Sequence, residues 1–242
     1  MRSPLTLRLA FAVGACVVFT GSLFAQELPR IAVGAKISTL GIGFEGATAV
    51  TNRSNVRGGF NFFNYDRVAT SDGITYDAEL TLRSVQITYD QYLIRGVHVS
   101  PGLLIYNGNR AHALASVPAG QSFSLGDSQY FSSLTNPVNG TATLKLRKVA
   151  PLLLFGFGNL LPRNNRHFGV NADLGVAFQG SPDVKLNLAG TACAVSPAVG
   201  CVNAATDPRV QTNILREQEQ ANDDLKPFKY YPVLSIGVSW KF

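Results

Sequence analysis

The chain ends with the nine residues "LSIGVSWKF", Leu234 to Phe242. Every second residue of this stretch is apolar, and the residues between are small or polar. A period of two is typical of a β-strand, because successive side chains of a strand point to opposite faces. The stretch therefore predicts a strand with one apolar face. The apolar positions are Leu234, Ile236, Val238, Trp240 and Phe242.

Seven further segments repeat this alternation, and together the eight predict an all-β chain. They cover residues 31–38, 41–50, 55–65, 73–87, 96–107, 143–158, 166–180 and 228–242. The parity of the apolar positions changes near Ser38, after Ser84 and around Pro151. A shift by one residue turns every side chain to the other face. We therefore expect a tight turn or bulge at the first change, and bulges or strand ends at the other two.

The connections between these segments alternate in length. Three are short, polar and turn-like: "TNRSN" (51–55), "YDQYLIRG" (89–96) and "LPRNNR" (161–166). The others include "DRVATSDG" (66–73) and two long inserts, about 108–142 and 181–227. In an up-and-down arrangement, the short turns all lie at one end and both inserts at the other. In the second insert, Asp207 and Pro208 suit the N-cap and first turn of a helix over 207–225.

The first 25 residues have the features of a secretory signal peptide. Arg2 and Arg8 precede the apolar run "LAFAVGACVVFTGSLFA", and small residues near Ala25 favour cleavage there. The mature domain would then be residues 26–242. Two alternatives stay open: an uncleaved N-terminal anchor, because the run approaches spanning length, and a lipoprotein with Cys16 as the lipidated residue.

Charge and motifs exclude several function classes. Without Arg2 and Arg8, 19 basic residues face 15 acidic ones, and the basic residues are scattered, so no nucleic-acid surface is indicated. We find no Gly-rich phosphate loop, metal-ligand cluster or nucleophile elbow, and expect no cofactor and no metal.

Cys193 and Cys201 form an even pair in an exported chain, which favours a disulfide. Free thiols or a metal pair are the alternatives, although no His or acidic residue lies between them.

Export, strand length and aromatic strand ends together favour a membrane barrel over a soluble β-sandwich. Within hydrocarbon every backbone polar group must be paired internally, which leaves helices or closed barrels. The segments are near ten residues or longer, as tilted spanning strands require. Tyr230, Tyr231 and Trp240 suit an interfacial girdle. We therefore expect an eight-stranded antiparallel transmembrane up-and-down β-barrel with long extracellular loops and a short helix in the last loop.

"LSIGVSWKF" resembles the C-terminal assembly signal of bacterial outer-membrane proteins, in which alternating apolar residues end on an aromatic residue. Residues 26–242 as a whole resemble the small barrels of the OmpA/OmpW type. The resemblance implies a location in the bacterial outer membrane. It also implies outer-membrane lipid, lipopolysaccharide and the barrel-assembly machinery as partners, and a monomer. Trp240 and Phe242 should then face the membrane boundary.

The alternation also predicts which polar side chains share the barrel lumen. An eight-stranded barrel is just wide enough for its interior to be filled by side chains, and isolated charges there would be costly, so we expect them to pair. This favours a structural or surface-interaction role with a filled lumen. The alternatives are a narrow porin-like channel and an OmpW-like transporter of small or hydrophobic solutes. The expected lumen residues are Lys36, Glu45, Arg57, Asp77, Glu79, Arg83, His98, Asp173 and Lys241.

An enzymatic role is the remote alternative. His98 and Ser100 share a strand face, as do the His and Ser of the PagL-type lipid deacylases. However, Pro101 follows Ser100, where that family's motif continues with Asn, and the alternation turns both side chains into the lumen, away from lipid. We therefore predict no catalytic residues, and take His98 as a lumen residue with a hydrogen-bond partner.

Overall fold

Eight strands form a closed antiparallel ring in the computed structural model, which describes residues 30–242 except 72, 95 and 164. Each strand pairs with its neighbours, and the last strand pairs back to the first, so this part has no free edge. The predicted signal peptide, residues 1–25, lies outside the described residues. The ring order is β1 (Ile31–Ser38), β2 (Gly41–Thr51), β3 (Ser54–Ser71), β4 (Ile74–Ile94), β5 (Val97–Asn107), β10 (Ala150–Gly158), β11 (Phe168–Phe178) and β15 (Tyr230–Lys241).

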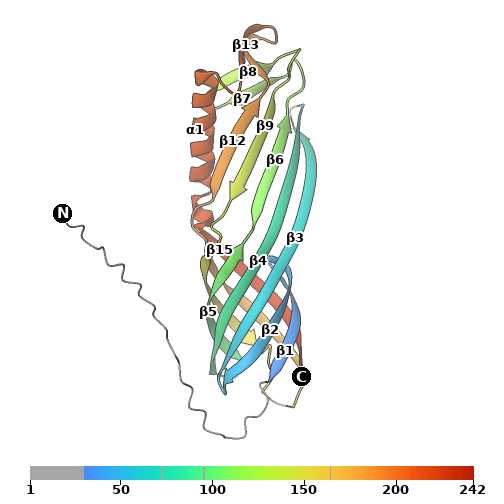
Figure 1. The fold of residues 1–242 in the computed structure, drawn as a ribbon, viewed down its shortest axis with the longest axis vertical. Helices are drawn as coiled ribbons and strands as arrows, with labels where there is room; N and C mark the ends of the chain where they lie inside the picture. Colours follow the sequence, from blue (N-terminus) through green and yellow to red (C-terminus); the bar gives the residue numbers. More distant parts are fainter. Residues whose placement is uncertain (1–29, 72, 95, 164) are drawn as a thin grey trace, which may run out of the picture.

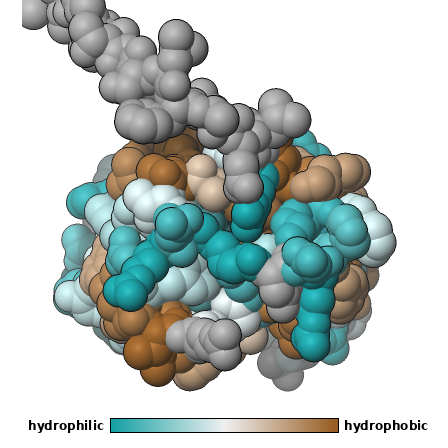
Figure 2. Space-filling view, turned by 90° about the horizontal axis from the view of Figure 1, so that it is seen from below, coloured by the Kyte–Doolittle hydropathy of each residue, from teal (hydrophilic) through white to brown (hydrophobic). Residues whose placement is uncertain are grey.

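Side chains in the ring alternate between a buried interior and an exposed outer face. On β15, Val233, Gly237 and Ser239 are buried, whereas Ile236 and Trp240 are more than half exposed. The outer face is apolar all round the ring. An apolar band of this width would be unfavourable in contact with water. From the short-turn end, hydrophilic residues cross the middle and hydrophobic residues lie at several places around the edge (Figure 2).

The β3–β4 hairpin continues far beyond the ring (Figure 1). Its register is unbroken from Ser54–Gln91 to Ser71–Ile74. The segment 66–73 is therefore strand and tight turn, not the loop that its polar residues suggested. The expected bulge after Ser84 is absent from this pairing, but the β4–β5 pairing has a register shift there, between Val85 and Gln86. In addition, the hydropathy of the two faces of β4 is exchanged at this level.

The exchange occurs on both strands at the same height. On the outer face of β3, Phe60 and Phe62 give way to Asn64 and Asp66. On β4, the inner-face polar residues are Ser84, Gln86, Thr88 and Asp90, whereas beyond them the inner-face positions are apolar. Arg83 pairs with Phe62 at this level. The molecule thus has a lower part that is apolar outside and polar inside, and an upper part with the opposite arrangement.

The two long inserts fold together into this upper part, which we call the head. β6 (Arg110–Ser116), β9 (Asn139–Lys145) and β12 (Asp183–Ala189) extend the sheet sideways from β4. The predicted strand 143–158 is therefore two strands, β9 and β10. A second sheet contains β7 (Ser122–Leu125), β8 (Ser128–Ser132), β13 (Thr191–Ser196) and β14 (Val199–Asn203). A disulfide joins Cys193 to Cys201 across the paired strands β13 and β14.

A helix closes the open side of the head sheet. It is α1 (Pro208–Asp224), followed by the 3₁₀ turn η1 (Lys226–Lys229). Asp207 caps it by accepting hydrogen bonds from the backbone of Arg209 and Val210, as the sequence predicts. Asn222 bonds both backbone groups of Val184, so α1 covers the edge of β12 that a further strand could otherwise pair with.

The head has its own hydrophobic core, formed by the two sheets and α1. Burial of this many apolar side chains makes the head a folded unit and not a pair of irregular loops. Among the described residues, no helix is long and apolar enough to cross a membrane. The core residues are Ile74, Val117, Phe123, Leu125, Tyr130, Val138, Ala192, Ala204, Val210 and Ile214.

Candidate functional site

Arg57 on β3 is the centre of a buried charge cluster in the ring. Its guanidinium donates to both carboxylate oxygens of Asp173 on β11, at 2.7 and 3.3 Å. It also donates to Asp90 on β4 at 3.1 Å. β3 and β4 are neighbours, whereas β11 lies on the other side of the ring, so Arg57 and Asp90 meet Asp173 across its interior. A bidentate Arg–carboxylate pair is among the strongest hydrogen-bonded arrangements available.

Three further groups join this charge layer. His98 Nε2 lies 2.9 Å from Asp173 Oδ1. Glu45 Oε2 lies 3.6 Å from both Lys36 Nζ and Arg57 Nη1. Two cations therefore face three carboxylates, and a protonated His98 would make the charges equal. Such compensation is what permits charges to stay buried.

Gly156 on β10 makes room for the His98–Asp173 pair. A methyl group in place of its hydrogen would overlap His98 Nε2 and Asp173 Oδ1. Gly237 plays a similar part, since a Cβ there would lie 2.8 Å from Asn171 Oδ1 and 2.9 Å from Glu45 Oε1. The interior glycines thus set the width available to the charge layer.

An apolar layer lies between the charge layer and the head. Leu154 and Val233 are each two residues nearer the head than Gly156 and Ser235, which are the strand neighbours of Asp173. The layer is fully buried and packed. It consists of Leu40, Leu104, Ala150, Leu152, Leu154, Ala177 and Val233, with Tyr231 against it.

The connection after β10 closes the ring at its short-turn end. Leu160 and Leu161 are buried, and Ser239 donates to the carbonyl of Leu160 at 2.6 Å. Asn159 accepts a hydrogen bond from the Tyr92 hydroxyl at 2.8 Å. Lys241 Nζ donates to the carbonyl of Pro162 at 3.1 Å. The interior is therefore filled in three layers along its axis: this connection, the charge layer and the apolar layer.

The structure brings together five of the nine expected lumen residues: Lys36, Glu45, Arg57, His98 and Asp173. Lys241 is buried apart from them, at the short-turn end. Asp77, Glu79 and Arg83 are exposed, which corrects their expected place in the lumen. They occupy the outer face of β4 at and above the level where the two faces exchange character, and there the outer face is polar.

Asp90 is the charged member of the cluster that the sequence argument missed. It fell in the segment 89–96, which was assigned to a connection because the segment is short, polar and turn-like. In the structure β4 continues to Ile94, and Asp90 is on the same inner face as Ser84 and Thr88. The period of two, continued past Tyr89, was the signal that could have found it.

His98 and Ser100 face the same buried interior, and their arrangement does not resemble a catalytic dyad. No hydrogen bond joins them among the described residues, and His98 Nε2 is engaged with Asp173 instead. Both side chains are at most 1% exposed. A lipid substrate outside the ring would have no access to either group.

The inner face of the head sheet and α1 enclose an apolar groove. Two adjoining recesses of about 340 and 450 Å³ share Ala113, Ala142, Leu186 and Ala221 in their lining. Ala78, Glu79 and Leu80 of β4 also line it. Small side chains on both the sheet and the helix leave this space open.

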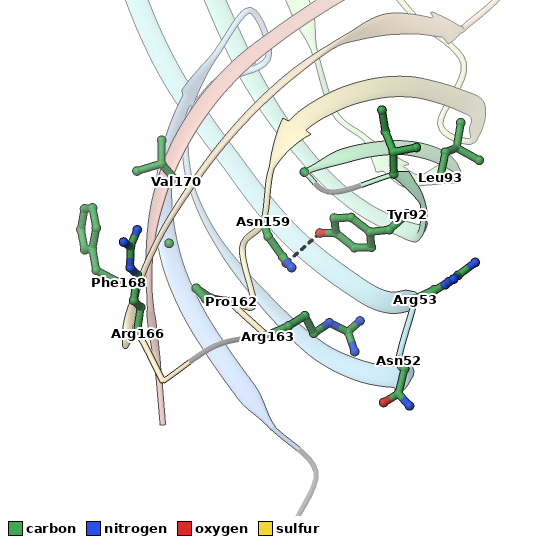
Figure 3. A pocket seen from close by; sticks show the side chains of 13 residues that line it. Asn52, Arg53, Tyr92, Leu93, Asn159, Pro162, Arg163, Arg166, Phe168 and Val170 are labelled. Carbon is green, nitrogen blue, oxygen red and sulfur yellow. Dashed lines mark hydrogen bonds between the residues drawn. The ribbon is translucent and has the colours of Figure 1, made fainter.

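At the short-turn end, a notch of about 790 Å³ lies between the end of β4 and the start of β11. Figure 3 shows Arg166 and Phe168 on one side of the notch, Leu93 and Arg53 on the other, and Asn159 and Arg163 between them. The five apolar residues of the C-terminal stretch point outward along the last ring strand, from Leu234 beside the β1–β2 turn to Phe242 at the short-turn end. They are Leu234, Ile236, Val238, Trp240 and Phe242.

No protein-family model matches the chain, and no curated protein sequence matches it. Solved structures do match it. The Acinetobacter baumannii protein CarO is 22% identical, with a TM-score of 0.54 over 87% of this chain and 97% of CarO. CarO2 of the same species is 18% identical, with a TM-score of 0.56 over 90% of this chain and all of CarO2. The chain therefore has the fold of small bacterial outer-membrane β-barrel proteins.

Proposed function

We propose that the protein is an integral outer-membrane protein whose closed barrel anchors a folded extracellular head. The observation that carries this proposal is the exchange of hydropathy along the β3–β4 hairpin. An outer face that is apolar in the ring and polar in the head fits a molecule that crosses from lipid into water near Phe62 and Arg83. Export through the predicted signal peptide, residues 1–25, is part of the proposal.

The filled interior favours an anchoring role over a channel. A solute path would have to cross the 159–162 connection, the Arg57 charge layer and the apolar layer in turn. Opening it would separate a buried ion cluster, at a cost of several kcal/mol. A porin-like channel or an OmpW-like transporter would therefore need a second conformation of the interior.

The head is the part that we infer to take part in surface interactions. Binding functions concentrate on segments displayed by a rigid scaffold, and the head is held by the long β3–β4 hairpin. Its groove beside α1 is lined mainly by apolar and small residues. We further infer that the protein is not an enzyme, because His98 and Ser100 are buried without a mutual hydrogen bond. Lipopolysaccharide is its expected lipid partner on the head side.

Surface labelling of intact cells tests the placement. A short biotin-acceptor tag inserted at Pro197, between β13 and β14, should be labelled from outside, whereas the same tag after Asn52 should require lysis. Both variants should fractionate with the outer membrane. If only the Asn52 tag were labelled in intact cells, the orientation would be the reverse of the proposed one. Recovery of the protein in the soluble fraction would refute the membrane location.

A headless barrel tests the role of the head. Residues 109–148 and 180–228 would be replaced by short turns, which leaves the eight ring strands intact. The variant should assemble but lose any adhesion to surfaces or host cells that the full protein confers. Unchanged adhesion by an assembled headless barrel would contradict the proposal.

A further inference from the structure

The notch at the short-turn end combines clustered positive charge with an apolar wall. Arg53, Arg163 and Arg166 line it, and none of the thirteen described residues that line it is acidic. Arg30 adds a fourth positive charge close to Arg163. Arg binds phosphate well, through two parallel hydrogen bonds.

The apolar wall is continuous with the outer face of the barrel. Leu93 and Ile94 at the end of β4 are 59% and 69% exposed, and Phe168 and Val170 at the start of β11 are 56% and 47% exposed. β5 and β10 stop short between them, at Val97 and Gly158. The notch therefore opens sideways as well as downward, at the level where strands end and headgroups begin.

Arg163 is held in place by the protein itself. Its guanidinium donates to the carbonyls of Thr51 and Ser54 at 2.6 and 3.1 Å, and to Asn55 Oδ1 at 2.8 Å. Burial lowers the pKa of this guanidinium, and the positive charge of Arg30 lowers it further, against the opposite influence of Tyr92. An anion bound in the notch would relieve this repulsion at a side chain whose position is already fixed.

We propose that the notch binds the phosphate of an anionic glycerophospholipid in the periplasmic leaflet of the outer membrane. Arg53 and Arg166 contact the phosphate, Arg163 supplies a fixed charge beside it, and an acyl chain lies along Phe168 and Val170. The site rests on the proposed outer-membrane location. Basic pockets beside lipid-facing surfaces recognise anionic headgroups through the same combination of charge and apolar contact.

The test is native mass spectrometry of the full mature protein in detergent micelles, with added phosphatidylglycerol or phosphatidylcholine of matched chain length. One phosphatidylglycerol should be retained in preference to phosphatidylcholine. In Arg53→Gln/Arg166→Gln, affinity for phosphatidylglycerol should fall at least about tenfold, as expected for lost charge-assisted hydrogen bonds. The matched control Arg110→Gln/Arg216→Gln removes two exposed head charges and should leave the affinity unchanged.

The outcomes separate this inference from the proposed function. Equal retention of both lipids, or equal affinity in the notch and control variants, would overturn the lipid site. Displacement of phosphatidylglycerol by an equal concentration of inorganic phosphate would identify a free-anion site and overturn the lipid assignment. Folding and location are read independently, from heat-modifiable gel migration and outer-membrane fractionation, and the notch variant should match the wild type in both.

Discussion

The Arg57 guanidinium binds the Asp173 carboxylate in two places across the barrel interior, with its shorter contact at 2.7 Å. The two residues are 116 apart in sequence, and their pair joins β3 to β11, which are not neighbours in the ring. Because Asp90, Glu45 and His98 contact the same pair, it is the central contact of the charge layer. The closed interior depends on these contacts.

We predict that Arg57→Leu lowers the free energy of unfolding by about 3–5 kcal/mol, because it leaves buried carboxylates without their cation. Arg57→Leu/Asp173→Leu should cost less than the two single changes added together. Urea unfolding in lipid vesicles, followed by the fluorescence of Trp240, the single tryptophan of the sequence, measures both. Arg110→Leu on the exposed head is the control, and strictly additive losses would contradict a coupled pair.

Gly156 should not tolerate a side chain. A Cβ there overlaps His98 and Asp173, so Gly156→Ala should destabilise the barrel by about 1–3 kcal/mol, as overpacking does. Gly46→Ala is the matched control, since the nearest atom to its Cβ would be 3.8 Å away. The same urea titration compares the two. Equal stabilities for the two variants would show that the interior is looser than the structure has it.

The contact between α1 and the edge of β12 can be tested alone. Val184 N–H donates to Asn222 Oδ1 at 2.8 Å, so Asn222→Ala should speed hydrogen exchange at Val184 by about three- to tenfold, from the loss of one hydrogen bond. Exchange in the ring strands should stay unchanged. Glu219→Ala, on the exposed face of α1, should leave exchange at Val184 as it is. Identical exchange in both variants would refute the edge-covering role of Asn222.

Removal of Phe242 should reduce the amount of assembled barrel several-fold, because it deletes the aromatic end of the predicted assembly signal. The side chain is 75% exposed, so its loss costs little packing within the barrel. Heat-modifiable migration of outer-membrane fractions measures assembly. Phe228→Ala, another exposed aromatic residue, is the control. A wild-type amount of assembled barrel after the deletion would contradict an assembly role for Phe242.

The eight ring strands could be predicted because lipid-facing and inward-facing residues differ so strongly in hydropathy. The head could not be predicted in this way. Its sheet has water on one side and a core on the other, so the same period-two pattern appears with the opposite orientation. In the ring, the polar residues of each strand face inward. Asp77, Glu79 and Arg83 were assigned to the lumen because the same rule was applied to the part of β4 that belongs to the head. The long inserts gave weak alternation, because β7, β8 and β14 are only four or five residues long.

Within the candidate site, the sequence predicted which side chains face inward but not which ones meet. The pairing of Arg57 with Asp173 depends on the stagger of strands that are distant in sequence. The notch at the short-turn end was beyond prediction for the same reason. The notch is lined by residues of two different turns, which the fold brings together at the short-turn end of the ring. These residues are Arg53, Arg163 and Arg166.

Solute flux into liposomes tests the closed barrel most directly. Purified protein would be reconstituted into liposomes loaded with a self-quenching dye, beside a water-filled porin at the same protein-to-lipid ratio. Because the charge layer and the two layers that flank it fill the interior, dye should leave these liposomes no faster than it leaves protein-free liposomes. The porin control should release its dye. Release of dye, or steady single-channel conductance in planar bilayers, by correctly folded wild-type protein would contradict the account.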